Sequence, residues 1–209
     1  MFIPVLIAAL TAYLLGNLNG AVCVSALVAH DDVRSHGSGN AGLTNFIRNY
    51  GTASAALVIV IDGGKAAVAC WACNLMLRPL GYGFEGLMLG GVCVMLGHIF
   101  PALLGFRGGK GILCGCIIAF VADWRIGAVI LAVFAVVYFS TRYVSLASVV
   151  AAAVFGICFV VLHGDNVPVM AAGLFMSLLT IFMHRGNLAR LCRGQERKTD
   201  LFKKKGAEQ

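Results

Sequence analysis

Two polar, glycine-rich stretches interrupt an otherwise apolar chain, and both carry residue types that bind phosphate. The first, residues 97–111, ends in two cations around a pair of glycines: Arg107, Gly108, Gly109 and Lys110. Glycine lets the backbone turn its N–H groups toward an anion, and the cations add fixed positive charge. Leu104 and Gly111 stand where a Walker A loop needs Gly and Ser or Thr, which excludes that motif. We predict an anion-binding loop, with a tight interhelical turn as the alternative.

The second stretch, residues 30–48, is dense in glycine, hydroxyl and amide groups. Its backbone N–H groups can wrap an oxyanion together with four side-chain donors, which are Ser38, Asn40, Thr44 and Asn45. An ordinary Gly/Ser turn is the alternative. Two such loops in one small chain favour a binding role.

Further polar groups lie within or beside apolar segments. Asp62 and Lys65 are three residues apart on one expected helix, so their charges can pair. Charges inside a membrane are functional candidates by default, although a structural pair fits almost as well. Ser145 and Ser148 open a later apolar run, where either hydroxyl could instead bond its own helix backbone.

The composition places the chain in a membrane. Of the 209 residues, 60% are hydrophobic and only 12% are charged, and the mean hydropathy is +0.90. We predict an all-α integral membrane protein of about seven transmembrane helices, forming a single polytopic domain over residues 1–209. The net charge of +7 reflects cations at segment ends and in the tail, so it does not indicate nucleic acid. The expected segments are residues 2–29, 53–77, 85–104, 111–122, 126–140, an apolar run that opens at residues 141–148 and ends at about 162, and residues 167–183.

The fourth of these segments is too short for a full crossing. Residues 111–122 make only ~18 Å of helix against a bilayer core of ~30 Å, so a short, tilted or re-entrant segment is expected. Whether residues 126–140 cross fully is left open by the sequence.

Lys and Arg fall mainly on one side of these segments. That side holds Arg34, Arg48, Arg107, Lys110, Arg142 and the eight cations of the tail, whereas the other holds Arg78 and Arg125. The positive-inside rule then predicts an N-terminus outside and a basic cytoplasmic tail at residues 185–209. All the polar clusters would share the cytoplasmic face.

The eight cysteines do not indicate a metal or redox site. Most lie inside apolar segments, where cysteine behaves as a small hydrophobe. Cys70 and Cys73 form a CxxC without a second ligand pair or a nearby histidine. We therefore expect no metal and no cofactor.

The motifs and their order resemble those of the bacterial acyl-phosphate-dependent glycerol-3-phosphate acyltransferases. Gly-Ser-Gly-Asn-Ala-Gly-Leu-Thr-Asn at residues 37–45 is similar to the first motif of that family, residues 97–111 to its second, and residues 143–148 to its third. The tail fits at residues 184–187 and 194–196, so the resemblance covers nearly the whole chain. The departures are Leu43 for Ala, residues 17–19 for a Ser-Ile-Pro-like turn, and Ala66 for the Gly that ends an Asp-x-x-Lys-Gly motif.

The resemblance implies acyl transfer from acyl phosphate to the 1-hydroxyl of glycerol 3-phosphate at the bacterial cytoplasmic (inner) membrane. The products are 1-acylglycerol 3-phosphate (lysophosphatidic acid) and phosphate, and this is the first step of phospholipid synthesis. The residues implied for the acyl-phosphate head are Ser38, Gly39, Asn40 and Thr44. Those implied for glycerol 3-phosphate and the transferring phosphate are Arg48, Lys110, Ser148, His184 and Asn187, the first four of which we expect to be catalytic. The expected partners are the two substrates and membrane lipid.

Two points stay open at this level. No histidine is followed by the His-x₄-Asp pair of the other acyltransferase class, so the proton acceptor is either His184 or a substrate phosphate oxygen. A small anion or metabolite transporter is the rival function, with Asp62 and Lys65 lining a path, although no internal repeat is visible.

Overall fold

Helices make up most of the described chain. The computed structural model describes residues 2–199, which form ten α-helices and three short 3₁₀ turns and contain no strand. The α-helices are α1 (Phe2–Gly16), α2 (Gly20–Ala29), α3 (Leu43–Tyr50), α4 (Ala55–Leu77), α5 (Gly83–Ile99), α6 (Ile112–Ala122), α7 (Trp124–Thr141), α8 (Val144–His163), α9 (Val167–Met183) and α10 (Arg185–Cys192). The 3₁₀ turns are η1 (Val33–Ser35), η2 (Arg78–Leu80) and η3 (Ala102–Leu104).

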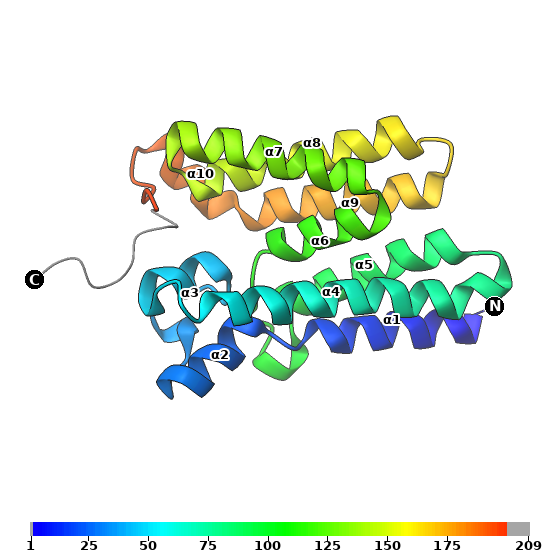
Figure 1. Cartoon of the computed structure of the whole chain (residues 1–209), viewed down its shortest axis with the longest axis horizontal. Helices are drawn as coiled ribbons and strands as arrows, with labels where there is room; N and C mark the ends of the chain where they lie inside the picture. The colour runs from blue at the N-terminus through cyan, green and yellow to red at the C-terminus, as the bar shows by residue number, and fades with distance from the viewer. Residues whose placement is uncertain (1, 200–209) are drawn as a thin grey trace, which may run out of the picture.

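The helices form two stacked groups with α6 between them (Figure 1). One group contains α1 to α5 and the other α7 to α10, and α5 packs against α9 across the boundary. The short helices α3 and α10 lie at the same end of the bundle, whereas the N-terminus lies at the opposite end (Figure 1). The short polar elements are therefore gathered at one end of the long helices.

The long helices suit a membrane. Within the described residues, five segments are long and apolar enough to cross a bilayer, and a sixth is added if the bent pair α9 and α10 is one span. The remaining apolar helix, α6, has 11 residues, which agrees with the short fourth segment that the sequence predicts. Large apolar side chains on the outer faces, such as Ile3, Val136 and Val161, are more than 60% exposed. An outer surface of this kind is what lipid requires.

The first crossing is broken in the middle. Helix α1 ends at Gly16 and α2 begins at Gly20, and the two amides between them are buried. Asn19 Oδ1 caps α2 by accepting from Val22 N at 3.0 Å, and its Nδ2 donates to Ala41 O at 3.0 Å. Asn17 Oδ1 accepts from Leu103 N at 3.0 Å. Both amides face protein, as expected for polar side chains inside a span.

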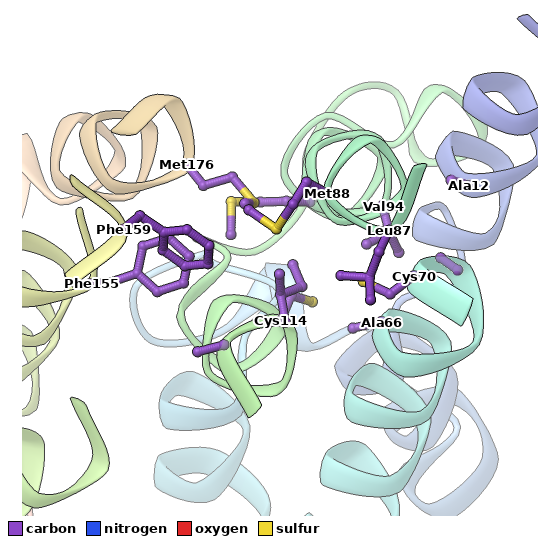
Figure 2. Close-up of a cluster of buried hydrophobic side chains, with 14 of the residues drawn as sticks. Ala12, Ala66, Cys70, Leu87, Met88, Val94, Cys114, Phe155, Phe159 and Met176 are labelled. Atoms are coloured by element: carbon purple, nitrogen blue, oxygen red, sulfur yellow. The ribbon is translucent and has the colours of Figure 1, made fainter. Parts of the chain in front are cut away.

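The main hydrophobic core joins the two groups of helices. Figure 2 shows Phe155, Phe159 and Met176 from α8 and α9 facing Met88 of α5, with Cys114 of α6 beside them. Because α6 fills the space between the two groups, its small side chains pack against both. The core therefore fixes how the polar loops of one group sit against those of the other.

Two sequence expectations need correction. Residues 30–48 were expected to form a loop, but α3 begins within them at Leu43. The tail was expected from residue 185, but α10 occupies its first eight residues and packs on α8 and α9. Asp123 lies between the expected segments 111–122 and 126–140, and it is the N-cap of α7, where Oδ1 accepts from Arg125 N at 3.0 Å. Helix α7 is 18 residues long and is therefore long and apolar enough to cross a membrane.

Candidate active site

The two glycine-rich stretches contact each other in the fold. Ala41 N donates to Gly108 O at 3.4 Å, and Arg34 Nη1 donates to Leu104 O at 2.8 Å. The break between α1 and α2 supports the same junction through the bond from Asn19 to Ala41 O. The sequence predicted two separate anion-binding loops, and the structure brings them together at one end of the bundle.

The loop before α3 is shaped by left-handed glycines and one buried amide. Gly37 and Gly39 have φ angles of 59° and 69°, and a Cβ on Gly37 would lie 2.4 Å from Asn45 Oδ1. Asn45 Oδ1 accepts from Ser38 N at 3.0 Å, and its Nδ2 donates to the carbonyls of Val33 and His36 at 3.0 Å each. The amide of Asn45 is thus used to hold the loop rather than to donate to a ligand.

Helix α3 starts at this loop without a side-chain cap. Its N-cap is Gly42, so no side chain accepts from the first N–H groups of the helix. An uncapped helix N-terminus beside a glycine-rich turn attracts anions through those N–H groups and the helix dipole. Thr44 and Arg48 are one helical turn apart and both line the cavity described next.

A cavity of about 1100 Å³ opens at this junction and extends between α6, α7, α8 and α9. Its polar end contains Ser38, Gly39, Asn40, Thr44, Asn45, Arg48, Lys110, Ser148, His184 and Asn187, which are ten of the thirteen residues predicted from the sequence. Its other end is lined by apolar side chains that include Ile130, Phe134, Phe155 and Met176. The cavity can therefore accept a molecule with one polar and one hydrocarbon part.

Positive charge dominates the cavity lining. Among the described lining residues, six are Lys or Arg and two are Asp or Glu. Lys110 Nζ donates to Asn187 Oδ1, and burial together with the nearby Arg190 and Arg48 lowers the pKa of Lys110 to about 8. Burial, with Arg197 and Arg190 close by, also lowers the pKa of Arg48. Cations crowded in this way are stabilised when an anion binds between them.

His184 and Ser148 reach the cavity from α9 and α8. His184 is 4% exposed, and its Nδ1 lies 2.8 Å from Thr180 O. A carbonyl can only accept, so Nδ1 carries the proton and the neutral ring keeps Nε2 as an acceptor. Ser148 Oγ donates to Val144 O at 2.8 Å, the backbone bond that the sequence left open, and its lone pairs remain available.

Residues 195–199, which we call the C-terminal segment, include four residues that line the cavity. Thr199 Oγ1 accepts from Arg48 Nε at 3.0 Å, and Arg197 O accepts from Arg48 Nη2 at 3.3 Å. The segment is also tied to the end of α7, because Tyr138 Oη donates to Thr199 O at 3.0 Å. The C-terminal segment therefore forms one wall of the cavity.

Three predicted site residues lie outside the cavity. Arg107 is exposed at the surface. Gly108 N donates to Ile99 O at 3.2 Å and Gly109 N to His98 O at 3.1 Å, so neither amide faces a ligand. A Cβ on Gly109 would lie 2.1 Å from His98 Nε2. The prediction that Gly108 and Gly109 donate to a ligand is therefore wrong. Both glycines instead allow the loop to pack closely against the end of α5.

The charges inside the spans pair with each other. Lys65 Nζ lies 2.7 Å from Asp62 Oδ1 and 3.0 Å from His98 Nδ1. It also donates to Gly16 O at 3.2 Å and to Leu18 O, while Asp62 Oδ1 accepts from Gly20 N at 3.0 Å. This cluster ties the break in the first crossing to α4 and α5, which fits the structural alternative.

Sequence reasoning gave no role to five charged residues of the basic tail that line the cavity, which are Arg185, Arg190, Glu196, Arg197 and Lys198. The available signal was the family resemblance at residues 194–196, which includes Glu196. The described residues contain no group of three or more His, Cys, Asp or Glu side chains placed to hold a metal ion.

The fold and the cavity define a helical membrane protein that can hold an anionic group beside a hydrocarbon chain. Comparison with known proteins narrows this class. The family model for glycerol-3-phosphate acyltransferase matches residues 6–194. The chain therefore belongs to the glycerol-3-phosphate acyltransferase family, as an integral membrane enzyme of the PlsY type.

Individual relatives agree with this assignment. Proteins named glycerol-3-phosphate acyltransferase include one from Burkholderia pseudomallei (strain 1710b), which is 38% identical over 206 residues, covering 97% of this chain and 99% of its own. Another, from Paraburkholderia xenovorans (strain LB400), is 37% identical over 191 residues, covering 91% of this chain and 89% of its own.

Solved structures show the same fold. The crystal structure of PlsY, an integral membrane glycerol 3-phosphate acyltransferase, in its glycerol 3-phosphate form has a TM-score of 0.85 at 29% identity, covering 95% of this chain and 99% of that one. The lysophosphatidic acid form of PlsY has a TM-score of 0.80 at 28% identity, covering 94% and 96%. These matches favour an enzyme over a transporter.

Proposed function

We propose that the chain transfers a fatty acyl group from acyl phosphate to the 1-hydroxyl of glycerol 3-phosphate, giving lysophosphatidic acid and inorganic phosphate. The observation that carries the proposal is the single cavity of about 1100 Å³ with cations at one end and apolar side chains at the other. An acyl phosphate has the same division into an anionic head and a hydrocarbon chain. Glycerol 3-phosphate adds a second anion at the cationic end.

The chemistry is proximity combined with anion stabilisation. The hydroxyl oxygen of glycerol 3-phosphate forms a bond to the acyl carbonyl carbon, and the bond from that carbon to the phosphate oxygen breaks, so phosphate leaves with the electron pair. The loop at Ser38, Gly39 and Asn40 and the N-terminus of α3 at Thr44 hold the acyl-phosphate head. Cations and N–H groups offset the repulsion of two anions and the charge of the tetrahedral state.

The second substrate is held by five residues, which are Arg48 of α3, Lys110 of the loop before α6, Ser148 of α8, His184 between α9 and α10, and Asn187 of α10. Arg48 and Lys110 supply charge, and the hydroxyl and amide groups fix orientation. Arg48 exchanges its present bonds to the C-terminal segment for phosphate oxygens.

The attacking hydroxyl needs a proton acceptor, and the cavity offers two. His184 keeps Nε2 free as an acceptor because Nδ1–H is bonded to Thr180 O. A phosphate oxygen of the substrate is the other. His184→Gln decides between them: a base at His184 predicts a loss of roughly 10²- to 10⁴-fold in kcat, whereas a substrate base predicts a much smaller change.

We further propose that the chain is a single polytopic domain with its N-terminus outside and its C-terminus cytoplasmic, so the active site faces the cytoplasm at the inner membrane. The excess of Lys and Arg at the end that carries α3, α10 and the C-terminal segment supports this orientation. Substrates made in the cytoplasm would then reach the site directly.

Purified protein in lipid tests the reaction. Release of phosphate from acyl phosphate that depends on glycerol 3-phosphate, with formation of a lysophosphatidic acid, is the expected result. Substituting a thioester donor for acyl phosphate is the matched control, because the cationic pocket for the donor head would then be left unfilled. Equal rates with both donors, or counterflow of glycerol 3-phosphate without chemistry, would overturn the proposal.

A further inference from the structure

The C-terminal segment contributes the acid that lies closest to the proposed phosphate-binding residues. The Glu196 side chain lines the cavity and is 4% exposed. Its Oε1 accepts from Asn187 Nδ2 at 2.8 Å, and its Oε2 accepts from Arg190 Nε at 2.7 Å. Both carboxylate oxygens are therefore engaged by fixed donors on α10.

This carboxylate determines how the Asn187 amide points. An ionised carboxylate accepts hydrogen bonds and cannot donate them, so the NH₂ group of Asn187 must face Glu196. The carbonyl oxygen of Asn187 then faces the other way, where it accepts from Lys110 Nζ. With the amide reversed, its NH₂ group would point at the ammonium, and two donors would oppose each other.

We propose that Glu196 is a positioning residue, which orients Asn187 and through it holds the Lys110 ammonium toward the transferring phosphate. The role rests on the proposed function, since Lys110 and Asn187 are placed there as phosphate-binding residues. Arg190 Nε donates to the second oxygen of Glu196 and so restrains the carboxylate. A segment that the sequence predicts as a basic tail thereby becomes part of the catalytic geometry.

Glu196 also acts on the charge of Lys110. The charged and titratable groups around that ammonium are Arg48 on α3, His184, Arg190 on α10 and Glu196 itself. Burial and the two arginines lower the pKa of Lys110, and Glu196 is the group that raises it. Removing the carboxylate should therefore shift the loss of the ammonium to lower pH.

The chain offers a matched control for this pair. At the other end of the molecule Glu85 Oε1 accepts from Asn166 Nδ2 at 2.7 Å, the same bond between the same side-chain types. Asn166 caps α9 there and lies outside the cavity. Removing the Glu85 carboxylate therefore shows what the loss of a Glu–Asn hydrogen bond does when the Asn contacts no catalytic residue.

The experiment is a double-mutant cycle on kcat/KM for glycerol 3-phosphate at neutral pH. Glu196→Gln should lower it by about 10- to 100-fold, as expected for a lost charge-assisted hydrogen bond. In the Asn187→Ala background the same change should cost less than about threefold, because Glu196 acts through Asn187. Glu85→Gln should stay within about threefold of wild type.

The pH profile gives a second readout that a merely structural contact would not move. Glu196→Gln should shift the alkaline limb of kcat/KM to lower pH, whereas Glu196→Asp keeps the charge and should leave the limb in place. The aspartate variant, one methylene shorter, also serves in the cycle if the glutamine variant does not fold.

Two results would overturn the role of Glu196. One is a wild-type rate in Glu196→Gln, and the other is a loss that is equally large with and without Asn187. Failure of wild-type protein to release phosphate in response to glycerol 3-phosphate would instead refute the proposed function. The two failures are thus separate.

Discussion

Removing Lys65 should unfold the protein far more readily than removing any cation at the cavity. The Lys65 and Asp62 side chains are each 2% exposed and lie 2.7 Å apart. Lys65→Ala would leave Asp62 with Gly20 N and His98, and would deprive the carbonyls of Gly16 and Leu18 of their donor at the helix break. The substitution therefore strands a buried charge and two buried acceptors at once.

The magnitude follows from the cost of breaking a buried pair. Removing one partner of such a pair destabilises by about 3–5 kcal/mol. For a chain of this size 1 kcal/mol corresponds to roughly 2–4 °C, so the expected fall in melting temperature is about 6–20 °C. The carboxylate would be the main contributor, because an unpaired charge is costlier to bury than an unpaired carbonyl.

Thermal melting in detergent, followed by circular dichroism, measures this fall. The control is the double variant Asp62→Asn/Lys65→Met, which removes both charges and keeps an acceptor for Gly20 N, so it should melt closer to wild type than Lys65→Ala does. A fall of less than about 2 °C for Lys65→Ala, which is under 1 kcal/mol, would refute the view that this cluster holds the helix break.

Two further sets of substitutions should leave thermal stability unchanged, and only the first should lower catalytic activity. Lys110→Ala should leave the melting temperature unchanged and lower turnover by roughly ten- to several-hundred-fold, and Lys110→Arg should restore part of the activity. A near-normal kcat/KM in Lys110→Ala would contradict the proposal that Lys110 binds phosphate. Because the pKa of Lys110 is lowered to about 8, the free enzyme loses the ammonium above that pH, and kcat/KM should fall there. Bound phosphate stabilises the ammonium, so the fall in kcat should occur at a higher pH than the fall in kcat/KM. Replacing Cys70 and Cys73 with Ala should leave activity within a few-fold of wild type; lost turnover in a folded variant would indicate a role. Cysteine-accessibility mapping should place residue 40 and the tail on the same side of the membrane, and opposite sides would contradict the topology.

The elements that hydropathy controls were predictable. The last apolar segment was expected at residues 167–183, and α9 occupies that range. A long apolar run predicts a helix reliably, because in lipid the backbone N–H and C=O groups can form hydrogen bonds only with each other. Helices α3 and α10 were missed because each has only eight residues and a polar composition, so their stability comes from packing that the sequence does not display.

The candidate site was predictable by residue type but not by orientation. Lys110 and Gly109 are neighbours in a glycine-rich stretch, yet only Lys110 reaches the cavity. The direction of Gly109 N–H is set by the carbonyl of His98, which belongs to the preceding helix. Glu196 could not be placed either, because its partners are fixed only when α10 docks against α8 and α9.

The contact between Arg48 and Thr199 joins residues 151 positions apart. At a synthesis rate of about 5–20 residues per second, Arg48 leaves the ribosome roughly 8–30 s before Thr199 does. During that time α4 to α10 are still being synthesised, and they supply most of the cavity lining. A nascent chain halted anywhere between these residues lacks the bond from Arg48 to Thr199, so the wall formed by the C-terminal segment is the last part of the cavity to be completed.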